Sequence, residues 1–322
     1  MAQRLFCLIV VAFVALTAGE ARAAPLRLGL LKFGTVSWEV DVVRHHGLAR
    51  AEGVEIEIVE LASTQATKVA LQGGAVDVIV SDWLWVSRQR ARGADYSFVP
   101  YSTALGALVT PSASPLRGLA DLAGRRLGVA GGPLDKSWLI LRALARKRTG
   151  RDLDTEPVFG APPLLNEQLK AGRIDAVLTF WPYAARLEAA GMRRLIAVAD
   201  AVRALGIGAA VPLVGYVFSE ALAATRGDEL AGFLRAARKA RALLANSDAE
   251  WDRLAPLMRA PDAATRRALR DGFRAGIPRR WGADERAAAR RLYAILAGIG
   301  GARLVGEARE LSPGTFWPGA VY

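Results

Sequence analysis

The stretch Ala70-Leu71-Gln72-Gly73-Gly74-Ala75-Val76-Asp77-Val78-Ile79-Val80-Ser81-Asp82-Trp83 has a counterpart further along the chain, Gln168-Leu169-Lys170-Ala171-Gly172-Arg173-Ile174-Asp175-Ala176-Val177-Leu178-Thr179-Phe180-Trp181. In both copies a leucine, a glycine, an aspartate, a small hydroxyl residue and a tryptophan hold matching positions. The apolar runs 76–80 and 174–178 are typical of short buried strands that follow a helix. The repeat therefore predicts two lobes built to one plan.

The similarity continues upstream of these stretches. Arg27-Leu28-Gly29-Leu30 matches Arg126-Leu127-Gly128-Val129, and Ser37-Trp38 matches Ser137-Trp138. Each copy alternates expected strands with expected helices, and such alternation predicts parallel sheets with right-handed crossovers. In the first copy we expect strands at 26–31, 54–61, 76–80 and 97–101, and helices at 37–49, 65–72 and 83–90. In the second we expect strands at 126–129, 157–159, 174–178 and 194–198, and helices at 136–148, 164–171 and 182–190.

The length of 322 residues suits two lobes better than one small core. Segments 105–110 and 212–219 have extended patterns, which predicts two strands that cross between the lobes as a hinge. The remainder, 220–322, has helical patterns and is expected to return to the first lobe. We therefore expect an α/β protein with residues 24–108 and 214–322 in lobe 1 and residues 109–213 in lobe 2.

The N-terminus has the pattern of a secretory signal peptide. A basic lead, Met1-Ala2-Gln3-Arg4, precedes the apolar run 5–18 and the small-residue site Ala21-Arg22-Ala23. The run is shorter than the ~20 residues that a membrane-spanning helix needs. We expect cleavage after Ala23 and a periplasmic location. Because Cys7 lies in this segment, the mature chain has no cysteine for disulfides, thiolate catalysis or metal binding.

The charge distribution and the few histidines argue against nucleic-acid binding, metal binding and catalysis. The formal charge of +12 is scattered among acidic residues, without a basic stripe that contains aromatic residues, so no nucleic-acid partner is expected. The only histidines, His45 and His46, would diverge by about 100° on a helix, which makes a poor metal pair. No nucleophile elbow or Cys/His pair occurs. We therefore expect no enzyme, no metal and no cofactor.

Polar and aromatic residues follow the expected strands, where open α/β sheets bind ligands. Trp83 and Trp181 hold matching places in the two copies, so we expect them to face each other as opposing walls of a cleft. Trp85, two residues beyond Trp83, is expected in the core. The expected ligand-binding residues are Phe33, Thr35, Trp38, Ser63, Thr64, Ser81, Asp82, Trp83, Asp135, Lys136, Ser137, Thr179, Trp181 and Tyr183.

Several of these residues have a second interpretation that the sequence leaves open. Asp82 and Asp135 each precede an expected helix, so either is a ligand contact or a helix N-cap. Lys136 either neutralises an anionic ligand or is a solvated lysine at the rim. Trp83 and Trp181 are alternatively packing residues between the lobes.

The chain resembles periplasmic substrate-binding proteins of ABC importers. It is most similar to the nitrate/sulfonate/taurine branch and its NMT1-like relatives, which bind pyrimidine precursors. The resemblance is carried by Ala70-Leu71-x-x-Gly74-x-x-Asp77, Leu119-Ala120-Asp121-Leu122-Ala123-Gly124-Arg125-Arg126-Leu127-Gly128-Val129, and Gly172-Arg173-Ile174-Asp175-Ala176 followed by Trp181-Pro182-Tyr183. It implies a type II periplasmic binding protein fold, with two mixed sheets joined by a two-strand hinge.

The same resemblance implies a function without bond cleavage. A monomer would capture a small solute between its lobes and deliver it to an ABC permease in the inner membrane. Two departures from the family pattern argue against a plain nitrate or alkylsulfonate ligand: Asp82-Trp83-Leu84-Trp85 stands where small polar residues are usual, and Trp181 runs directly into Pro182. Expected helix N-termini favour an anionic group, whereas acids and indoles favour an amine or a flat ring. We therefore expect a small organic molecule with a ring or mixed charge rather than an inorganic anion. Two alternatives remain: a solute sensor for a signalling receptor, and an enzyme like the pyrimidine synthases of this fold.

Overall fold

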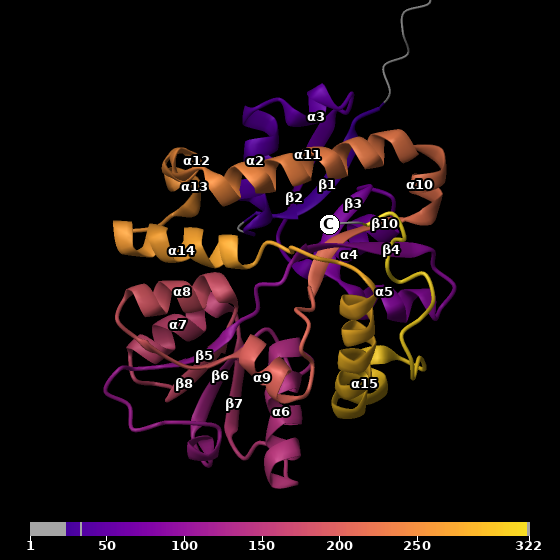
Figure 1. The fold of residues 1–322 in the computed structure, drawn as a ribbon. Helices are drawn as coiled ribbons and strands as arrows, with labels where there is room; N and C mark the ends of the chain where they lie inside the picture. The colour runs from indigo at the N-terminus through magenta and orange to yellow at the C-terminus, as the bar shows by residue number, and fades with distance from the viewer. Residues whose placement is uncertain (1–23, 33, 321–322) are drawn as a thin grey trace, which may run out of the picture.

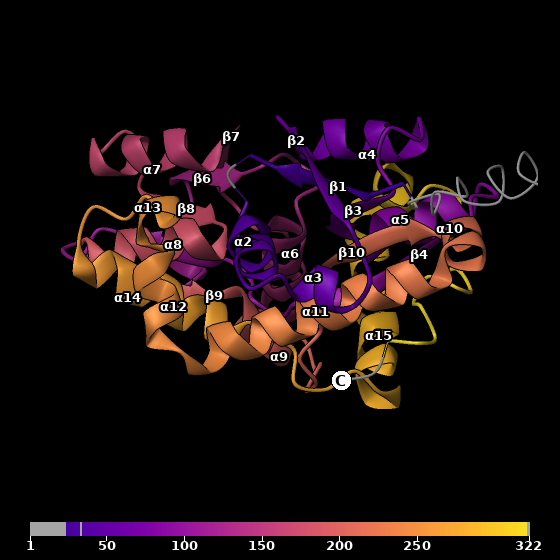
Figure 2. The ribbon, with the colours of Figure 1, turned by 90° about the horizontal axis from the view of Figure 1, so that it is seen from above.

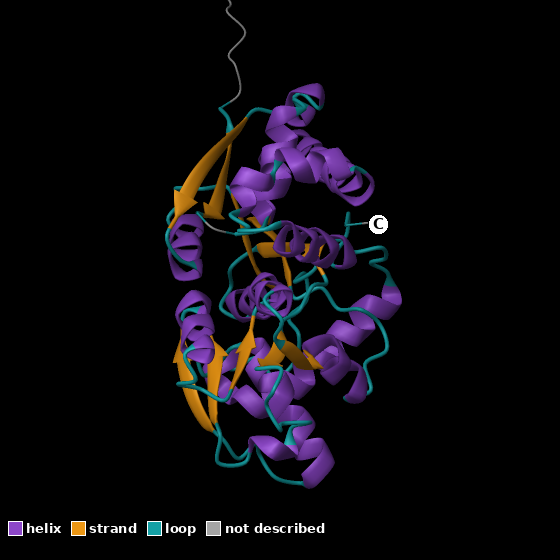
Figure 3. Cartoon of the chain, turned by 90° about the vertical axis from the view of Figure 1, so that its left-hand side faces the viewer, coloured by secondary structure: helices purple, strands orange, loops and turns teal. Residues whose placement is uncertain are grey.

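The computed structural model describes residues 24–32 and 34–320. The expected signal peptide and Phe33 lie outside the described residues. The chain forms two five-stranded sheets flanked by helices, which confirms the expected α/β class. Figure 1 shows the two lobes one above the other, and Figure 3 shows their strands as two separate groups.

The first sheet has the strand order β2-β1-β3-β10-β4. Strand β1 pairs in parallel with β2 and β3, whereas β10 pairs antiparallel with β3 and β4. The strands are β1 (Leu26–Leu31), β2 (Ile56–Leu61), β3 (Val78–Asp82), β4 (Tyr96–Ser102) and β10 (Val214–Ser219).

The second sheet repeats this plan in the order β7-β6-β8-β5-β9. Strand β6 is parallel to β7 and β8, and β5 is antiparallel to β8 and β9. In each sheet the fourth strand therefore comes from the segment that crosses between the lobes. The strands are β5 (Ala107–Thr110), β6 (Arg126–Ala130), β7 (Glu156–Gly160), β8 (Ala176–Thr179) and β9 (Arg193–Ala197).

The crossing segment before β5 passes close to the end of β8. At Gly106 a Cβ atom would lie 2.1 Å from the carbonyl oxygen of Thr179, so a larger residue would push the two segments apart. Ala107 and Leu108 pair with Thr179 and Leu178, which places them in the second sheet, two residues before the boundary we expected.

Helices follow the strands of each lobe much as the sequence pattern predicts. Polar side chains start several of them: Ser63 accepts a hydrogen bond from the N–H of Ala66, and Asp135 accepts from those of Ser137 and Trp138. The first lobe has α2 (Val36–His45), α3 (Leu48–Ala51), α4 (Thr64–Gln72) and α5 (Trp83–Arg90). The second has the 3₁₀ helix η1 (Ala120–Leu122), α6 (Lys136–Thr149), α7 (Pro162–Lys170), α8 (Trp181–Ala189) and α9 (Val198–Ala204).

The C-terminal segment is helical, as expected, but it reaches both lobes. Helix α11 packs on α2 and α3 of the first lobe, whereas α14 packs on α8 and α15 on α6, both in the second (Figures 1 and 2). Both α14 and α15 also contact the first lobe, through Phe273 against Trp38 and Tyr293 against Trp83, so the segment packs on both lobes rather than on the first alone. The helices are α10 (Glu220–Thr225), α11 (Gly227–Asn246), α12 (Asp248–Arg253), α13 (Ala255–Met258), α14 (Ala263–Ala275) and α15 (Ala283–Val305).

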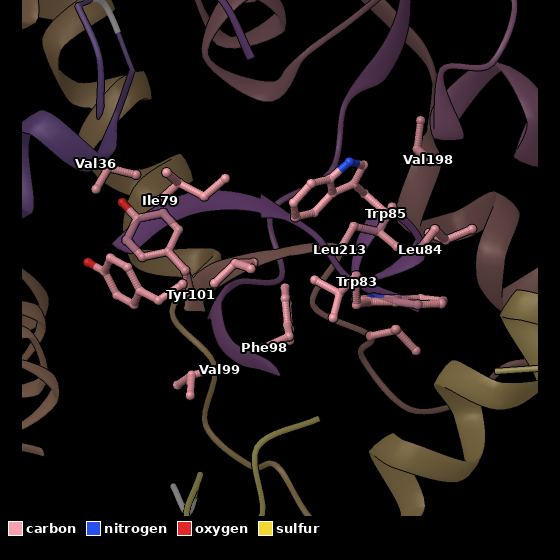
Figure 4. Close-up of a cluster of buried hydrophobic side chains, with 14 of the residues drawn as sticks. Val36, Ile79, Trp83, Leu84, Trp85, Phe98, Val99, Tyr101, Val198 and Leu213 are labelled. Atoms are coloured by element: carbon pink, nitrogen blue, oxygen red, sulfur yellow. The ribbon is translucent and has the colours of Figure 1, made fainter. Parts of the chain in front are cut away.

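The largest hydrophobic core is continuous across the two lobes. It includes strand residues of both sheets, such as Leu28 and Leu127, as well as the inner faces of α6 and α15. Figure 4 shows the part around the tryptophans at the start of α5. Within residues 24–32 and 34–320, no helix combines the length and the apolar character that crossing a membrane requires.

Candidate functional site

Asp82 lies at the carboxyl end of β3, where the two lobes meet. One carboxylate oxygen, Oδ1, accepts a hydrogen bond from the N–H of Trp85 (2.9 Å) and so caps α5. The other, Oδ2, accepts from Nζ of Lys136 (2.9 Å), the first residue of α6 in the second lobe. Asp82 is only 8% exposed. A partly buried ion pair therefore joins the lobes at the strand ends where the sequence predicts ligand binding.

Lys68 on α4 completes a cluster with this pair. Its Nζ lies 3.5 Å from Oδ2 of Asp82 and 5.3 Å from the centre of the Trp85 ring. Lys68 is not among the residues expected from the sequence, because it lies within a helix and not at the end of a strand. One signal was present: Lys68 follows the strand-end pair Ser63-Thr64 by about one helical turn. Asp82, Lys68 and Lys136 together form the lysine cluster.

Burial and charge act in opposite directions on the three groups. Burial raises the pKa of Asp82, but Lys136 and then Lys68 lower it more, so it lies well below its ordinary value. Burial lowers the pKa of Lys68, and attraction to Asp82 offsets this only in part. Burial also lowers the pKa of Lys136, but Asp82 outweighs it and the net shift is upward. At neutral pH Asp82 is therefore ionised and Lys136 is protonated.

Both aspartates that preceded expected helices are helix caps. Asp135 accepts hydrogen bonds from the N–H groups of Ser137 (2.9 Å) and Trp138 (3.2 Å) through one oxygen. Asp82 combines its cap with the ion pair to Lys136. Because both of its oxygens are used within the chain, Asp82 holds the two lysines in place rather than offering a free carboxylate to a cationic ligand.

The side-chain hydroxyls of two predicted ligand-binding residues, Ser81 and Thr179, are buried and make no hydrogen bond among the described residues. Ser81 is 7% exposed and Thr179 is 1% exposed, and neither hydroxyl has a hydrogen-bond partner among the described residues. They hold matching places in the two repeats, at the ends of β3 and β8. Buried hydroxyls without a partner are uncommon, because leaving one unpaired is unfavourable.

The other predicted polar residues are more dispersed. Ser63 and Thr64 lie at the exposed start of α4, and the Ser63 side chain is used as the cap. Thr35 precedes α2 and makes no side-chain capping bond. Ser137 is buried in the first turn of α6, and Tyr183 is half-buried in α8, where its carbonyl accepts a hydrogen bond from Asn166.

The expectation that Trp83 faces a cleft is wrong. Its side chain is 0% exposed, and its indole N–H donates to the carbonyl of Pro212 (2.8 Å) in the second crossing segment. The ring packs against Tyr293 on α15 and against Phe316, with centroid distances of 6.3 and 5.9 Å. Trp85 is also buried and stacks on Tyr96 (Figure 4). Trp83 therefore belongs to the core beneath the hinge.

Trp181 packs between the lobes and does not face Trp83. Its half-buried ring meets Trp38 edge-on at 6.1 Å, and a Cβ atom on Gly272 of α14 would come within 2.8 Å of it. Trp38, another predicted ligand residue, is 5% exposed and also contacts Trp251 and Phe273. The aromatic residues thus form interlobe packing, the alternative interpretation, and not opposing walls.

An exposed aromatic residue of the second lobe packs against the first turn of α6. Phe159 on β7 is 37% exposed, and its ring meets Trp138 at a centroid distance of 6.3 Å. Trp138 is two residues beyond Lys136 on α6. The helix that starts with Lys136 therefore has an exposed aromatic ring against its first turn.

Sequence comparison assigns the chain to a known family. The profile of the NMT1/THI5-like family matches residues 42–250. The chain belongs to this family. No curated protein matched the sequence.

Solved structures share the fold of this NMT1/THI5-like chain. The alkanesulfonate-binding protein SsuA from Xanthomonas axonopodis pv. citri, bound to MOPS, has a TM-score of 0.70 at 23% identity, covering 92% of this chain and 99% of that one. The aliphatic sulphonate-binding protein SsuA from Escherichia coli has a TM-score of 0.72 at 22% identity, covering 91% and 92%. A cysteine-to-serine mutant of DszB in complex with biphenyl-2-sulfinic acid has a TM-score of 0.59 at 18% identity, covering 85% and 93%. These matches confirm the expected two-lobed periplasmic binding protein fold.

Proposed function

We propose that this chain is an extracytoplasmic solute-binding receptor that captures a small organic anion between its lobes and delivers it to an ABC permease. The observation that carries the proposal is the lysine cluster. It contains ammonium groups from both lobes, since Lys68 lies on α4 and Lys136 on α6. A ligand that accepts hydrogen bonds from both would be held by both lobes at once.

The two ammonium groups have donors left for a ligand. Each lysine carries three N–H donors, and Lys136 uses one of them for Asp82. The Lys68 and Lys136 side chains remain 16% and 25% exposed, so a small solute can reach them. A charged donor makes a stronger hydrogen bond than a neutral one. These features favour an oxyanion as the group that is recognised.

The surroundings favour an organic anion over a bare inorganic one. Phe159 offers exposed apolar surface near the start of α6, where its ring contacts Trp138. Two structural neighbours are named for binding alkanesulfonates or aliphatic sulphonates. Small organosulfonates are therefore the first ligands to test.

Catalysis is the weaker alternative. His46 lies within hydrogen-bond distance of Glu250 (Nε2 to Oε1, 2.9 Å), just beyond the C-terminal end of α2 and far from Thr35 at its other end. The single cysteine, Cys7, falls in the predicted signal peptide. The lysine cluster itself offers charge and hydrogen bonds but no nucleophile paired with a base. A sensor that feeds a signalling receptor would capture the same ligand, and binding of the purified chain to a permease would distinguish the two roles.

The test is calorimetric titration of residues 24–322 with a series of linear alkanesulfonates. Lys136→Met should weaken binding by about tenfold to a hundredfold, because a hydrogen bond from a charged group contributes about 1.5–3 kcal/mol. The matched control is Lys170→Met, which removes an exposed lysine of the same lobe that pairs with Glu167. If Lys136→Met binds as tightly as Lys170→Met, the lysine cluster is not the anion site.

A further inference from the structure

We propose that Asp82 selects ligands with a single negative charge. Its fixed carboxylate already neutralises one of the two ammonium groups, so one further negative charge balances the site. This inference rests on the proposed function, since it concerns the charge of the ligand at the same site. It assigns Asp82 the role of a specificity-determining residue in addition to its roles as helix cap and ion-pair partner.

The proposal starts from the charges around the cluster. Lys136 and Lys68 lie 2.9 and 3.5 Å from Asp82. Arg88 on α5 and Asp135, next to Lys136, are close enough to influence the pKa values of these groups. The Nε of Arg88 is buried and has no hydrogen-bond partner among the described residues. Within the lysine cluster, two ammonium groups and one carboxylate leave a net charge of +1.

A ligand with one negative charge would bring this total to zero, whereas a dianion would leave one anion without compensation. Repulsion by Asp82 would not be relieved by solvent, because Asp82 is only 8% exposed and screening is weak in such surroundings. The Asp82 side chain is also fixed in orientation, because Oδ1 accepts a hydrogen bond from the N–H of Trp85 and Oδ2 accepts one from Lys136.

Protonation also does not remove the negative charge of Asp82. The neighbouring lysines keep its pKa well below the ordinary value, so the carboxylate is ionised at the pH of the titrations. The second charge of a dianion would therefore meet a permanent carboxylate next to the ammonium groups it needs.

The experiment compares two ligands of matched shape, methanesulfonate and sulfate. Both are tetrahedral and share three S–O groups, but the fourth substituent is a methyl group in one and a charged oxygen in the other. Titrations are done at pH 7.5 and constant ionic strength with the wild type and Asp82→Asn. The asparagine has the size of aspartate and is an equally good N-cap, so the start of α5 is preserved.

The wild type is expected to prefer methanesulfonate. Asp82→Asn should shift the ratio of the two affinities toward sulfate by about tenfold or more, because the net charge available to the ligand rises by one. Using the ratio between variants removes the contribution of the methyl group. The matched control is Asp262→Asn, the same chemical change at an exposed N-cap of α14, where Asp262 accepts from the N–H of Thr265. Its affinity ratio should equal that of the wild type.

The possible outcomes separate this proposal from the proposed function. If Asp82→Asn weakens both ligands to the same extent, Asp82 only positions the lysines and the charge-selection proposal is overturned. If longer alkanesulfonates bind the wild type but the ratio of methanesulfonate to sulfate affinity is the same in Asp82→Asn, the charge-selection proposal fails while the receptor function stands. If no sulfonate binds the wild type, both fail. A thermal melt checks folding, and Asp82→Ser, which keeps a capping oxygen, replaces Asp82→Asn if that variant does not fold.

Discussion

Replacing Trp83 with alanine should destabilise the protein far more than replacing Trp181, although the two tryptophans hold matching places in the repeat. Trp83 is fully buried, and truncating a buried tryptophan to alanine costs about 3–5 kcal/mol. The change also removes the indole N–H that donates to Pro212, which adds about 1 kcal/mol for the lost hydrogen bond. We therefore expect Trp83→Ala to lose about 4 kcal/mol or more, much of the stability of a typical domain.

Trp181→Ala should lose less, because its ring is half-buried. The edge-on contact with Trp38 contributes about 0.5–1.5 kcal/mol beyond the burial of the ring's area. We expect a total of about 1–3 kcal/mol, concentrated at the contact between α8, α14 and α2. Urea denaturation followed by far-UV circular dichroism measures both values, and calorimetric titration with an alkanesulfonate measures the affinity of the folded variants.

Trp83→Phe serves as the control, since it keeps an aromatic ring and removes the indole N–H. It should retain most of the stability that Trp83→Ala loses. The packing argument would be refuted if Trp83→Ala kept the unfolding midpoint of the wild type and instead bound the sulfonate at least tenfold more weakly. In that case the ring would face the ligand, as the repeat alone had predicted.

Two further predictions follow from buried charges. Glu39→Ala should destabilise the first lobe by about 3–5 kcal/mol in urea denaturation, because it leaves Arg241 and the hydroxyl of Tyr216 without their buried carboxylate partner; the double variant with Arg241→Met should recover most of this loss, and no recovery would contradict the pairing. Sulfonate affinity should fall as pH rises, starting below the ordinary lysine value of 10.5, because burial lowers the pKa of Lys68 while the sulfonate keeps its charge; Lys68→Met should flatten this part of the pH profile, and an unchanged slope would exclude Lys68 from the site.

The architecture could be predicted because the repeat specifies it locally. A strand, a helix and a second strand of similar length can pair in few ways, and the same motif twice gives the same strand order twice. The extended segments at 105–110 and 212–219 became the antiparallel fourth strands of the two sheets. The destination of α14 and α15 could not be predicted, because their amphipathic patterns show that one face is buried but not against which lobe.

Part of the site was predictable for a similar reason. Asp82 ends β3 and caps α5, and Lys136 starts α6 after the short turn that follows β6, so their place at the sheet edge depends only on local structure. Lys68 lies one turn into its helix, and its distance from Asp82 depends on how α4 packs. The orientation of Trp83 depends on still more distant residues, since Tyr293 and Phe316 form its surroundings. Sequence spacing carries no information about such contacts.

If an anion binds the lysine cluster as proposed, it would link binding to the relative position of the two lobes. A ligand shifts the balance between two arrangements only by the difference in its affinity for them. An anion that touches Lys68 alone would bind open and closed lobes equally, whereas one that also accepts a hydrogen bond from Lys136 gains that bond only when the lobes are together. Asp82 already holds Lys136 across the same boundary, so the lobes are aligned before the anion adds its own bonds.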